Sequence, residues 1–249
     1  MNPRADRTGI GPFISALRDR TAAGTAALRR IAAQTALPAE PLAHLREVTE
    51  TEDLPERFTA AARLAGCQVQ VVRPEGWVDA AIDILRAVPA KSVFVQPEPT
   101  TALTAERAAQ LCPALEAAGI ALCDRPDDPT LFAVEASLTG VRLAVAETGS
   151  LVCCSGPAAA RGASLIPPVH IALLAATQIV PDLFDAFAAL GAGESTPATV
   201  PSGLSSGTPD LPANLNFITG PSKTADIEGV LVTGVHGPGQ VHVLVVESW

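Results

Sequence analysis

The stretch CQVQVVRPEGWVDAAIDILRAVPAKSVFVQ, residues 67–96, decides the fold class of this chain of 249 residues. Residues 67–72 and 92–96 are short runs rich in valine, a composition typical of β-strands. Between them, residues 77–88 have apolar side chains three and four positions apart, which is the spacing of an amphipathic helix. Strand, helix and strand in this order predict parallel strands joined by a helix.

The same alternation continues along the chain. Residues 104–119 are typical of a helix, with Pro113 inside it, and residues 120–124 are typical of a strand. Residues 128–140 are predicted to form a further helix that ends at Gly140. The repeated alternation predicts an α/β fold with a mainly parallel sheet covered by helices on both faces.

The second half of the chain has a different pattern. Residues 142–148 and 150–155 are apolar runs separated by Gly149, which predicts a tight bend or a pair of strands. Residues 168–176 are predicted to be a buried strand, and residues 181–191 a short helix ended by glycine. After residue 140 we therefore expect more than a plain alternation of strand and helix.

The composition excludes several classes of function. Hydrophobic residues make up 48% of the chain and charged residues 17%, as in a compact globular protein. The formal net charge of −9 argues against nucleic acid as a partner, because phosphate binding requires concentrated Lys and Arg. No apolar run reaches the roughly 18 residues of a membrane span and no signal segment opens the chain, so a cytoplasmic location is expected.

The cysteines form no pattern that binds a cluster or a metal ion. Cys67, Cys112, Cys123, Cys153 and Cys154 contain no CxxC pair, so the spacing offers neither an iron–sulfur nor a zinc signature. The adjacent pair Cys153 and Cys154 lies in an apolar run, where buried free thiols are expected. We therefore expect no cofactor and no metal in this chain.

Two segments stand apart from the α/β pattern. Residues 1–46 contain more arginine than acid and have apolar residues at helical spacing, which predicts one or two amphipathic helices. Residues 192–214 are rich in Gly, Ser, Thr and Pro, and a segment of this kind is either a plain or disordered loop or a functional lid. We expect an N-terminal helical extension over residues 1–57 and an α/β domain over residues 58–249.

The stretch GPSKTADIE, residues 220–228, has the features of an anion-binding turn. A strand over residues 214–220 runs into Gly-Pro-Ser, and Ser222 or Thr224 can cap a helix that follows. Lys223 would add a cation at the N-terminus of that helix, where the backbone N–H groups and the dipole favour anions. A short structural helix start explains the same residues, so both interpretations stay open.

The next stretch predicts a hairpin. The runs GVLVTGV and QVHVLVV flank a Gly-Pro-Gly turn at residues 237–239. A loop of three residues, 238–240, would place His236 and His242 opposite each other on one face of the hairpin. Such a pair can act in acid–base chemistry or bind a metal, or be ordinary sheet residues. No third ligand is fixed by spacing, so no metal site is predicted.

A carboxylate and a histidine are further candidates. Glu147, in AETGS, ends an apolar strand next to Thr148 and Gly149, where α/β sheets place their ligands. Burial there would raise the pKa of the carboxyl group and permit work as a general base or nucleophile. A capping or solvated acid is the alternative. His170 enters the strand predicted at 168–176, where we expect a core histidine.

Four stretches together resemble a known family. AETGS, LIPPVHIAL, QIVP and GPSKTADIEGVLVTGVHGP follow one another in this order. In this order they resemble the LUD-domain family of lactate-utilisation protein C (LutC/YkgG type), over roughly residues 60–247. The fold that this resemblance implies is similar to the NagB/RpiA/CoA-transferase group, an α/β sandwich with a mainly parallel sheet.

The resemblance implies a role in a bacterial system that oxidises L-lactate to pyruvate. In that system the family member works with iron–sulfur subunits, one of which is itself a LUD protein with an added cysteine-rich region. This chain has no such region, so the resemblance implies the subunit without iron–sulfur clusters. Its partners would be the iron–sulfur subunits and a small carboxylate or phosphate-bearing ligand.

The motif residues of this chain are the candidate site. The candidate catalytic residues are Glu147, His236 and Asp226. The candidate ligand-binding residues are Thr148, Gly149, His170, Gly220, Ser222, Lys223, Thr224, Glu228, Gly237 and His242. We expect residues 220–242 to build one wall of a small-anion pocket at the carboxyl edge of the sheet, with Glu147 on the opposite wall.

Two other classes of function stay open. By fold analogy the chain could be a self-sufficient enzyme, either an acyl/CoA transferase with Glu147 as nucleophile or a phosphosugar isomerase. It could also be a non-catalytic scaffold, whose basic N-terminal helices dock an acidic partner. Neighbouring genes for iron–sulfur subunits would favour the lactate system over both.

Overall fold

The computed structural model describes most of the chain after residue 46. The described residues are 47–48, 52–123, 128–156, 159–191, 212, 214–225 and 231–249. The helices expected in residues 1–46, almost all of the loop expected at 192–214, and both Asp226 and Glu228 lie outside these ranges. The described part belongs to one compact unit, Glu47–Trp249. The domain boundary at residue 57 stays a prediction.

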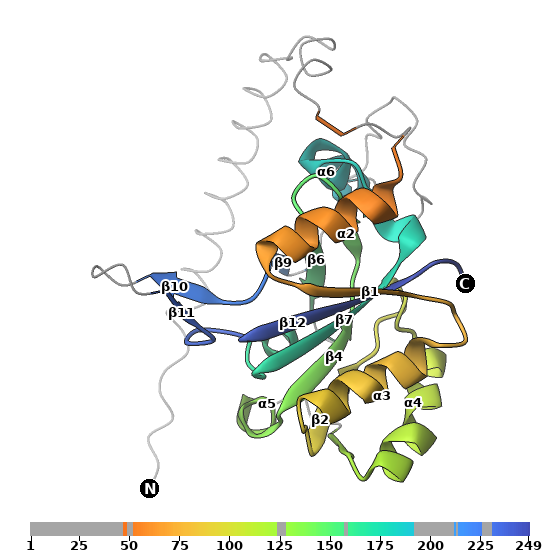
Figure 1. Ribbon diagram of the computed structural model, residues 1–249, viewed down its shortest axis with the longest axis vertical. Coiled ribbons are helices and arrows are strands. Elements are labelled where there is room, and N and C mark those ends of the chain that lie inside the picture. Colours follow the sequence, from red (N-terminus) through yellow and green to blue (C-terminus); the bar gives the residue numbers. More distant parts are fainter. Residues whose placement is uncertain are drawn as a thin grey trace, which may run out of the picture. The chain divides into compact units, whose positions relative to one another are not determined.

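A parallel sheet forms the centre of the described part. Its six strands lie in the order β1-β12-β7-β4-β2-β3, and every neighbouring pair is parallel. The strands are β1 (Gln68–Val72), β12 (Gln240–Val246), β7 (Val169–Ala175), β4 (Ala136–Gly140), β2 (Ser92–Gln96) and β3 (Ala121–Cys123). All six begin at the same edge of the sheet, here called the amino edge, and end at the carboxyl edge (Figure 1). The α/β class predicted from the sequence is confirmed.

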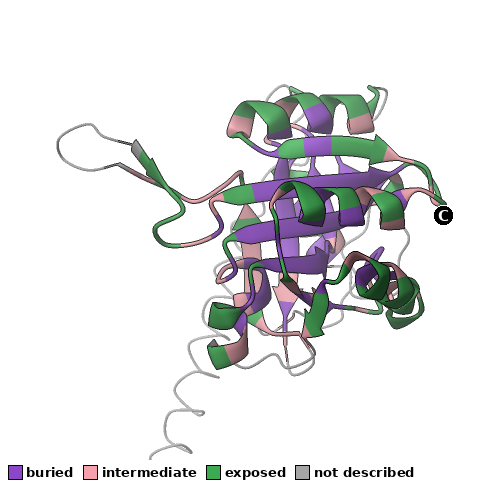
Figure 2. Cartoon of the chain, turned by 60° about the horizontal axis from the view of Figure 1, so that its bottom comes forward, coloured by how far each residue is buried: buried purple, intermediate pink, exposed green. Residues whose placement is uncertain are grey.

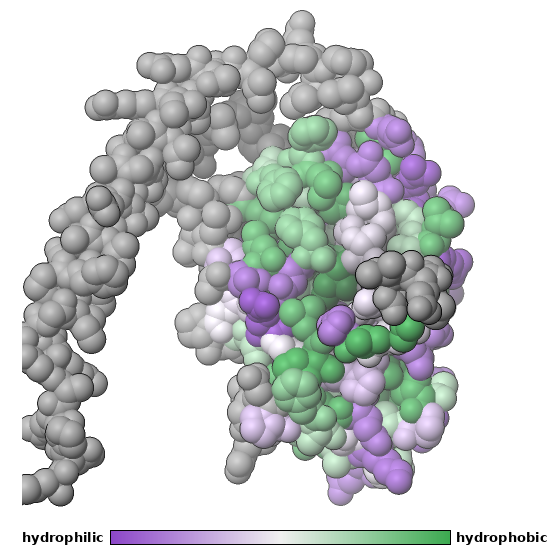
Figure 3. Space-filling view, turned by 90° about the vertical axis from the view of Figure 1, so that its left-hand side faces the viewer, coloured by the Kyte–Doolittle hydropathy of each residue, from purple (hydrophilic) through white to green (hydrophobic). Residues whose placement is uncertain are grey.

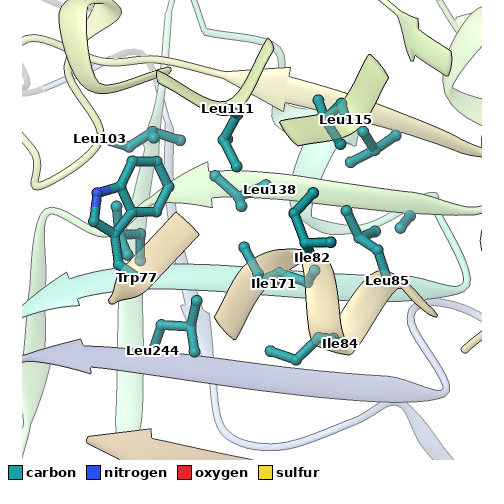
Figure 4. Close-up of a cluster of buried hydrophobic side chains, with 14 of the residues drawn as sticks. Trp77, Ile82, Ile84, Leu85, Leu103, Leu111, Leu115, Leu138, Ile171 and Leu244 are labelled. Carbon is teal, nitrogen blue, oxygen red and sulfur yellow. The ribbon is translucent and has the colours of Figure 1, made fainter. Parts of the chain in front are cut away.

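Two helices cover one face of this sheet, here called the outer face. They are α3 (Trp77–Ala87) and α4 (Ala105–Ala118). The helix α4 begins at Thr104, whose hydroxyl oxygen accepts from the backbone N–H of Arg107 at 3.3 Å. Apolar side chains from both helices meet Leu138, Ile171 and Leu244 of the sheet in one buried cluster (Figure 4). This is the largest of the buried apolar clusters in the described part of the chain.

The opposite, inner face is covered by a helix and a second sheet. The helix is α2 (Leu54–Ala65), which begins at its N-cap Asp53 and ends at Gly66. The second sheet has the order β8-β5-β6-β9, with β8 (Ile179–Val180), β5 (Leu143–Val145), β6 (Ser150–Ser155) and β9 (Asn214–Ile218). Apolar side chains of α2, β5 and β6 pack on those of β7 and β12. A sheet therefore covers much of the face on which the sequence predicted only helices.

Shorter elements complete the layers. The helix α6 (Leu183–Gly191) packs on the far side of the second sheet, against Leu143, Val145 and Val152. The helix α5 (Asp128–Ala133) and the 3-10 helix η3 (Arg161–Ser164) contribute the side chains that pack on Phe94 of β2. A further 3-10 helix, η4 (Ala176–Gln178), joins β7 to β8. The described unit is thus helices, parallel sheet, second sheet and helix in succession (Figure 1).

The helix predicted over residues 128–140 is wrong in its second half. The helix ends at Ala133, and Ala136–Gly140 is β4, which lies between β7 and β2. Every residue of β4 is buried, because the strand is covered on both faces. A short strand buried on both sides has no polar alternation, so its pattern does not separate it from a helix.

The predictions after residue 220 also require correction. No helix begins at Ser222: Lys223–Ala225 is a strand, β10, paired with β11 (Leu231–Thr233) in an antiparallel ribbon. Gln240–Val246 does not turn back on β11 but becomes β12, between β1 and β7. The reason is composition, since β12 is apolar on both faces and suits the centre of a parallel sheet. Figure 2 shows the ribbon exposed and the central strands buried.

The surface of the described unit is mixed. Apolar surface gathers in the upper part of the face drawn in Figure 3. Exposed aromatic side chains include Phe184 and Phe187 of α6 and Phe217 of β9, and the rings of Phe187 and Phe217 lie 5.6 Å apart. Within the described ranges, none of the helices combines the length and the apolar character that a membrane crossing requires.

Candidate functional site

Two glycine turns of the motif stretches lie against the helix α2. Gly149 has a φ of 67°, and a Cβ atom there would lie 2.2 Å from the backbone nitrogen of Ala62. Gly220 has a φ of 86°, and a Cβ atom there would lie 2.3 Å from the carbonyl oxygen of Ala65. Both positions combine a left-handed backbone with a close approach, so only glycine fits. The helix α2 therefore brings AETGS and GPSKT together, although they lie far apart in the sequence.

Hydroxyl groups join the same two turns. The Oγ1 atom of Thr148 lies 2.7 Å from the Oγ atom of Ser150, which lies 2.7 Å from the Oγ1 atom of Thr219. Ser150 is buried and Thr219 is exposed, so the row of hydroxyls runs from the core to the surface. Sequence reasoning named Thr148 but missed Ser150 and Thr219. The available signal was their position next to the two glycines.

Lys223 does not have the surroundings predicted for it. Its Nζ atom donates to the carbonyl oxygen of Ala65 at 3.0 Å, so the cation lies at the C-terminus of α2 and not at a helix N-terminus. A positive charge at this end of a helix interacts favourably with the helix dipole. Nearby, the N–H of Ser222 donates to Pro238 and the N–H of Gly239 donates to Pro168. Because β7 and β12 begin just after these prolines, this region lies at the amino edge, not the predicted carboxyl edge.

A buried cysteine lies beneath these turns. Cys67 follows the C-cap Gly66 of α2 and precedes β1, and its side chain is buried. Burial raises the pKa of the Cys67 thiol, while the backbone of Gly220 and the charge of Lys223 act in the opposite direction. This thiol was not among the candidates, since a lone cysteine in a chain without CxxC pairs has no distinguishing spacing.

The structure places Glu147 on the same turn as Gly149. The turn joins β5 to β6, and Glu147 is half-buried there. Its backbone N–H donates to the carbonyl oxygen of Pro181 at 3.0 Å, which ties the turn to the residue that follows β8. Glu147 thus lies at the end of a strand, as predicted, but that strand belongs to the second sheet.

The histidines do not form the predicted pair. His236 is exposed in the turn after β11, whereas His242 is buried in β12, so the two do not oppose each other across a hairpin. Burial lowers the pKa of His242. Gly237 does approach the motif turn, because a Cβ atom there would lie 3.2 Å from the Cβ of Ser222. Thr224 is half-buried in β10 opposite Val232.

His170 is a core histidine, as expected. It is fully buried in β7, and its Nε2 atom lies 2.8 Å from the Oγ1 atom of Thr139 in β4. Burial lowers the pKa of His170 to about 4, so the ring is neutral at pH 7. His170 therefore lies between the two sheets.

We call the group Thr148, Gly149, Ser150, Thr219, Gly220 and Lys223, with the C-terminal half of α2, the α2-turn site. Its hydroxyls, its glycine backbone and one ammonium group are donors that suit an anion. The part of the chain that the structure describes contains no group of three His, Cys, Asp or Glu side chains that could hold a metal ion.

The layered sheet and the α2-turn site define an α/β protein in which two glycine turns close on one helix. The LUD domain family model matches residues 56–246 of this chain. The chain therefore belongs to the LUD domain family.

Individual relatives match over shorter segments. Lactate utilization protein C of Geobacillus sp. is 38% identical over 104 residues, which cover 42% of this chain and 39% of the relative. Lactate utilization protein C of Bacillus subtilis is 35% identical over 111 residues, which cover 45% of this chain and 42% of the relative. The matched segments thus span less than half of these relatives.

One solved structure is also similar. The crystal structure of a DUF162 family protein from Deinococcus radiodurans has a TM-score of 0.47 and 20% sequence identity. The match covers 78% of this chain and 96% of that chain.

Proposed function

We propose that this chain is the component without iron–sulfur clusters of a system that uses L-lactate, and that it binds a small carboxylate or phosphate-bearing ligand at the α2-turn site. The observation that supports the site is the meeting of Gly149 and Gly220 on α2, since these glycines belong to two of the four stretches that resemble the family. The names of the relatives from Geobacillus sp. and Bacillus subtilis support the lactate role.

The chemistry of the α2-turn site suits a small anion. Thr219 is the exposed end of the hydroxyl row and directly precedes Gly220. Lys223 follows in the same stretch of the chain. Hydroxyl and ammonium donors of this kind bind carboxylates and phosphates by charge-assisted hydrogen bonds. Glu147, on the turn that holds Gly149, is the proposed base. The roles of His236 and Asp226 in catalysis stay predictions.

The electrons of lactate oxidation would pass to partner subunits. The five cysteines of this chain lie on four separate elements: Cys67 before β1, Cys112 in α4, Cys123 in β3, and the pair Cys153 and Cys154 in β6. Four cysteines in reach of one another are the usual ligands of an iron–sulfur cluster. We therefore propose that the clusters belong to the iron–sulfur subunits.

Growth on lactate tests the proposed role. A bacterial strain that lacks its lactate utilization protein C should regain growth on L-lactate when it expresses this chain. Growth on glucose is the control for general fitness. Normal expression of a folded chain without any growth on L-lactate would contradict the role.

Calorimetry with L-lactate, pyruvate and inorganic phosphate tests the ligand. Lys223→Ala should weaken binding of the preferred anion by about 1–3 kcal/mol, the scale of a charge-assisted hydrogen bond. Lys91→Ala is the matched control, because Lys91 is exposed and the charge change is the same. Equal binding by both variants would show that the ligand does not use Lys223. Thermal melts must accompany the titration, because Lys223 also donates to the C-terminus of α2.

A further inference from the structure

The space between the two sheets has an apolar half and a polar half. Over β12 and β1 the inner face presents apolar side chains such as Val243 and Val69. Over β4, the end of β2 and the start of β7 it presents polar ones. These are Gln96, Ser137, Thr139 and His170, and Cys153 and Ser155 are buried residues of β6 in the second sheet that covers this face. We call this group the inter-sheet polar cluster.

Two contacts connect members of the cluster. Three buried polar atoms in or beside it have no hydrogen-bond partner among the described residues. Thr139 lies near both His170 and Cys153, since its hydroxyl group contacts the histidine ring and acts to lower the pKa of the thiol. The Oγ atom of Ser137, the Nδ1 atom of His170 and the Oδ1 atom of Asn214 are buried without a hydrogen-bond partner among the described residues. Ser137 and His170 are neighbours in register, and Asn214 pairs with Ser155. Buried polar atoms normally have partners, so this cluster has an unmet capacity for hydrogen bonds.

The chain topology indicates that a ligand would bind at the carboxyl edge of the parallel sheet, at one end of this cluster. After β2 the chain passes to α4 on the outer face, whereas after β4 it passes to β5 and β6 on the inner face. Since β2 and β4 are neighbours, the connections leave adjacent strands toward opposite faces. Such a switch point is where open α/β sheets bind ligands. The turns on α2 lie at the other edge.

Two opposite charges lie at this switch point. The Nη1 atom of Arg142, just after β4, lies 3.5 Å from the carbonyl oxygen of Thr100, just after β2. Glu98 accepts a hydrogen bond from the hydroxyl of Thr100 at 3.1 Å. Both charges act on Cys154: burial and Glu98 raise the pKa of this thiol, and Arg142 lowers it, with a net value of about 11. Arg142 and Glu98 are therefore close neighbours, because each of them contacts Thr100.

Glycine allows the loop after β2 to close over β4. A Cβ atom on Gly140, the last residue of β4, would lie 1.9 Å from the hydroxyl oxygen of Thr101. Thr101 itself is buried, and its hydroxyl group donates to the carbonyl oxygen of Glu98 at 2.9 Å. The loop that places Glu98 is thus fixed on the end of β4 beside Arg142.

We propose that Arg142, Asn214 and Glu98 form a second site, at the carboxyl edge, for a small hydroxy monocarboxylic acid. The guanidinium group of Arg142 holds the carboxylate by paired hydrogen bonds. The Oδ1 atom of Asn214 accepts from the hydroxyl group of the ligand, which supplies the donor that this buried oxygen needs. The site is separate from the α2-turn site, and it rests on the proposed function only for the choice of L-lactate as the probe.

Glu98 gives this site a selectivity. A ligand with a second carboxylate would bring like charges together beside Glu98, which is unfavourable. The site therefore accepts L-lactate and rejects malate. Glu98→Gln removes the charge and keeps the shape, so it should reduce the preference for lactate over malate at least several-fold.

Binding of L-lactate, followed by calorimetry on the full chain, tests the site. Arg142→Gln should weaken binding at least tenfold, whereas Arg86→Gln, a matched change on the outer helix α3, should leave it unchanged. Asn214→Leu provides a second, uncharged variant in case Arg142→Gln unfolds. Wild-type affinity in a folded Arg142→Gln or Asn214→Leu variant would overturn the proposal.

Thiol labelling reports where the ligand lies. L-Lactate should slow the alkylation of Cys154 and leave that of the exposed Cys112 unchanged, as measured by mass spectrometry. Loss of L-lactate binding in Lys223→Ala but not in Arg142→Gln would place the ligand at the α2-turn site and overturn this inference alone. Failure of growth on lactate with intact binding at Arg142 would overturn the proposed role alone.

Discussion

The two faces of the parallel sheet bury different kinds of side chain. On the outer face, Leu138 and Ile171 belong to a continuous apolar cluster under α3 and α4. One residue earlier on the same strands, Ser137 and His170 point to the inner face and are fully buried polar groups. Because neighbouring residues in a strand face opposite sides, β4 and the start of β7 present apolar side chains to the outer face and polar ones to the inner face. The strand β12 and the rest of β7 are apolar on the inner face as well. Around Ser137 and His170 the inner face therefore lacks the continuous apolar packing of the outer face.

The outer face should show the largest loss on truncation. Trp77 is 1% exposed, and its ring meets that of Trp249 edge-on at 6.3 Å. Trp77→Ala should lower the free energy of unfolding by about 3–5 kcal/mol, measured by urea unfolding with circular dichroism. Leu64→Ala is the control, since Leu64 is 91% exposed. A loss below about 1 kcal/mol for Trp77→Ala would show that the outer cluster is not the main core.

The glycine turns on the inner side should tolerate almost no side chain. Gly149→Ala should cost about 3–4 kcal/mol, because it adds backbone strain to a clash with the backbone of Ala62. Gly119→Ala separates the two effects: its φ is 68°, but nothing lies within 4 Å of the added methyl group. That variant should lose only about 1–2 kcal/mol. Equal losses would mean that the contact with α2 is not tight.

The buried histidine should make the inner face sensitive to acid. The folded protein keeps His170 neutral down to about pH 4, whereas the unfolded chain binds this proton near its ordinary pKa of 6.5. The unfolded state therefore binds more protons in this window, and stability falls as the pH falls. His170 should account for a loss of roughly 3 kcal/mol between pH 7 and pH 4. Urea unfolding at several pH values measures it.

His170→Gln is the control for this slope. The variant should lose stability less steeply with falling pH than the wild type, and the difference between the two curves is the part due to His170. His242, whose pKa is also lowered by burial, contributes to both curves and cancels. Parallel curves would show that the His170 ring is protonated equally in both states.

Most of the sheet could be predicted from the sequence, because local patterns specify it. The runs at 67–72, 92–96 and 150–155 became β1, β2 and β6, and the apolar spacing of 77–88 became α3. The errors occurred where the local pattern has two solutions. Ala136–Gly140 is buried on both faces, and Gln240–Val246 found parallel neighbours instead of the nearer β11.

The site was predictable only in part. The glycines at 149 and 220 were named from their motifs, and their meeting on α2 depends on a helix that no local pattern connects to them. The edge was wrong because GPSKT was read as a helix start, and the strand β10 follows instead. No local sequence pattern marks Asn214 or Arg142, because their place in the proposed second site follows from strand register and chain topology.

The smallest expected change in stability tests whether buried polar atoms on the inner face lack hydrogen-bond partners. The hydroxyl group of Ser137 is buried without a partner among the described residues, so Ser137→Ala removes a polar atom that costs free energy to bury. The variant should be as stable as the wild type or up to about 1 kcal/mol more stable. Thr139→Val is the matched change, because Thr139 lies two residues further along β4 and faces the same side of the sheet. Thr139 contacts both His170 and Cys153, so its loss should destabilise by about 1–2 kcal/mol. If Ser137→Ala costs as much as Thr139→Val, the Ser137 hydroxyl has a partner in solution, and the inter-sheet polar cluster is already satisfied in the free protein.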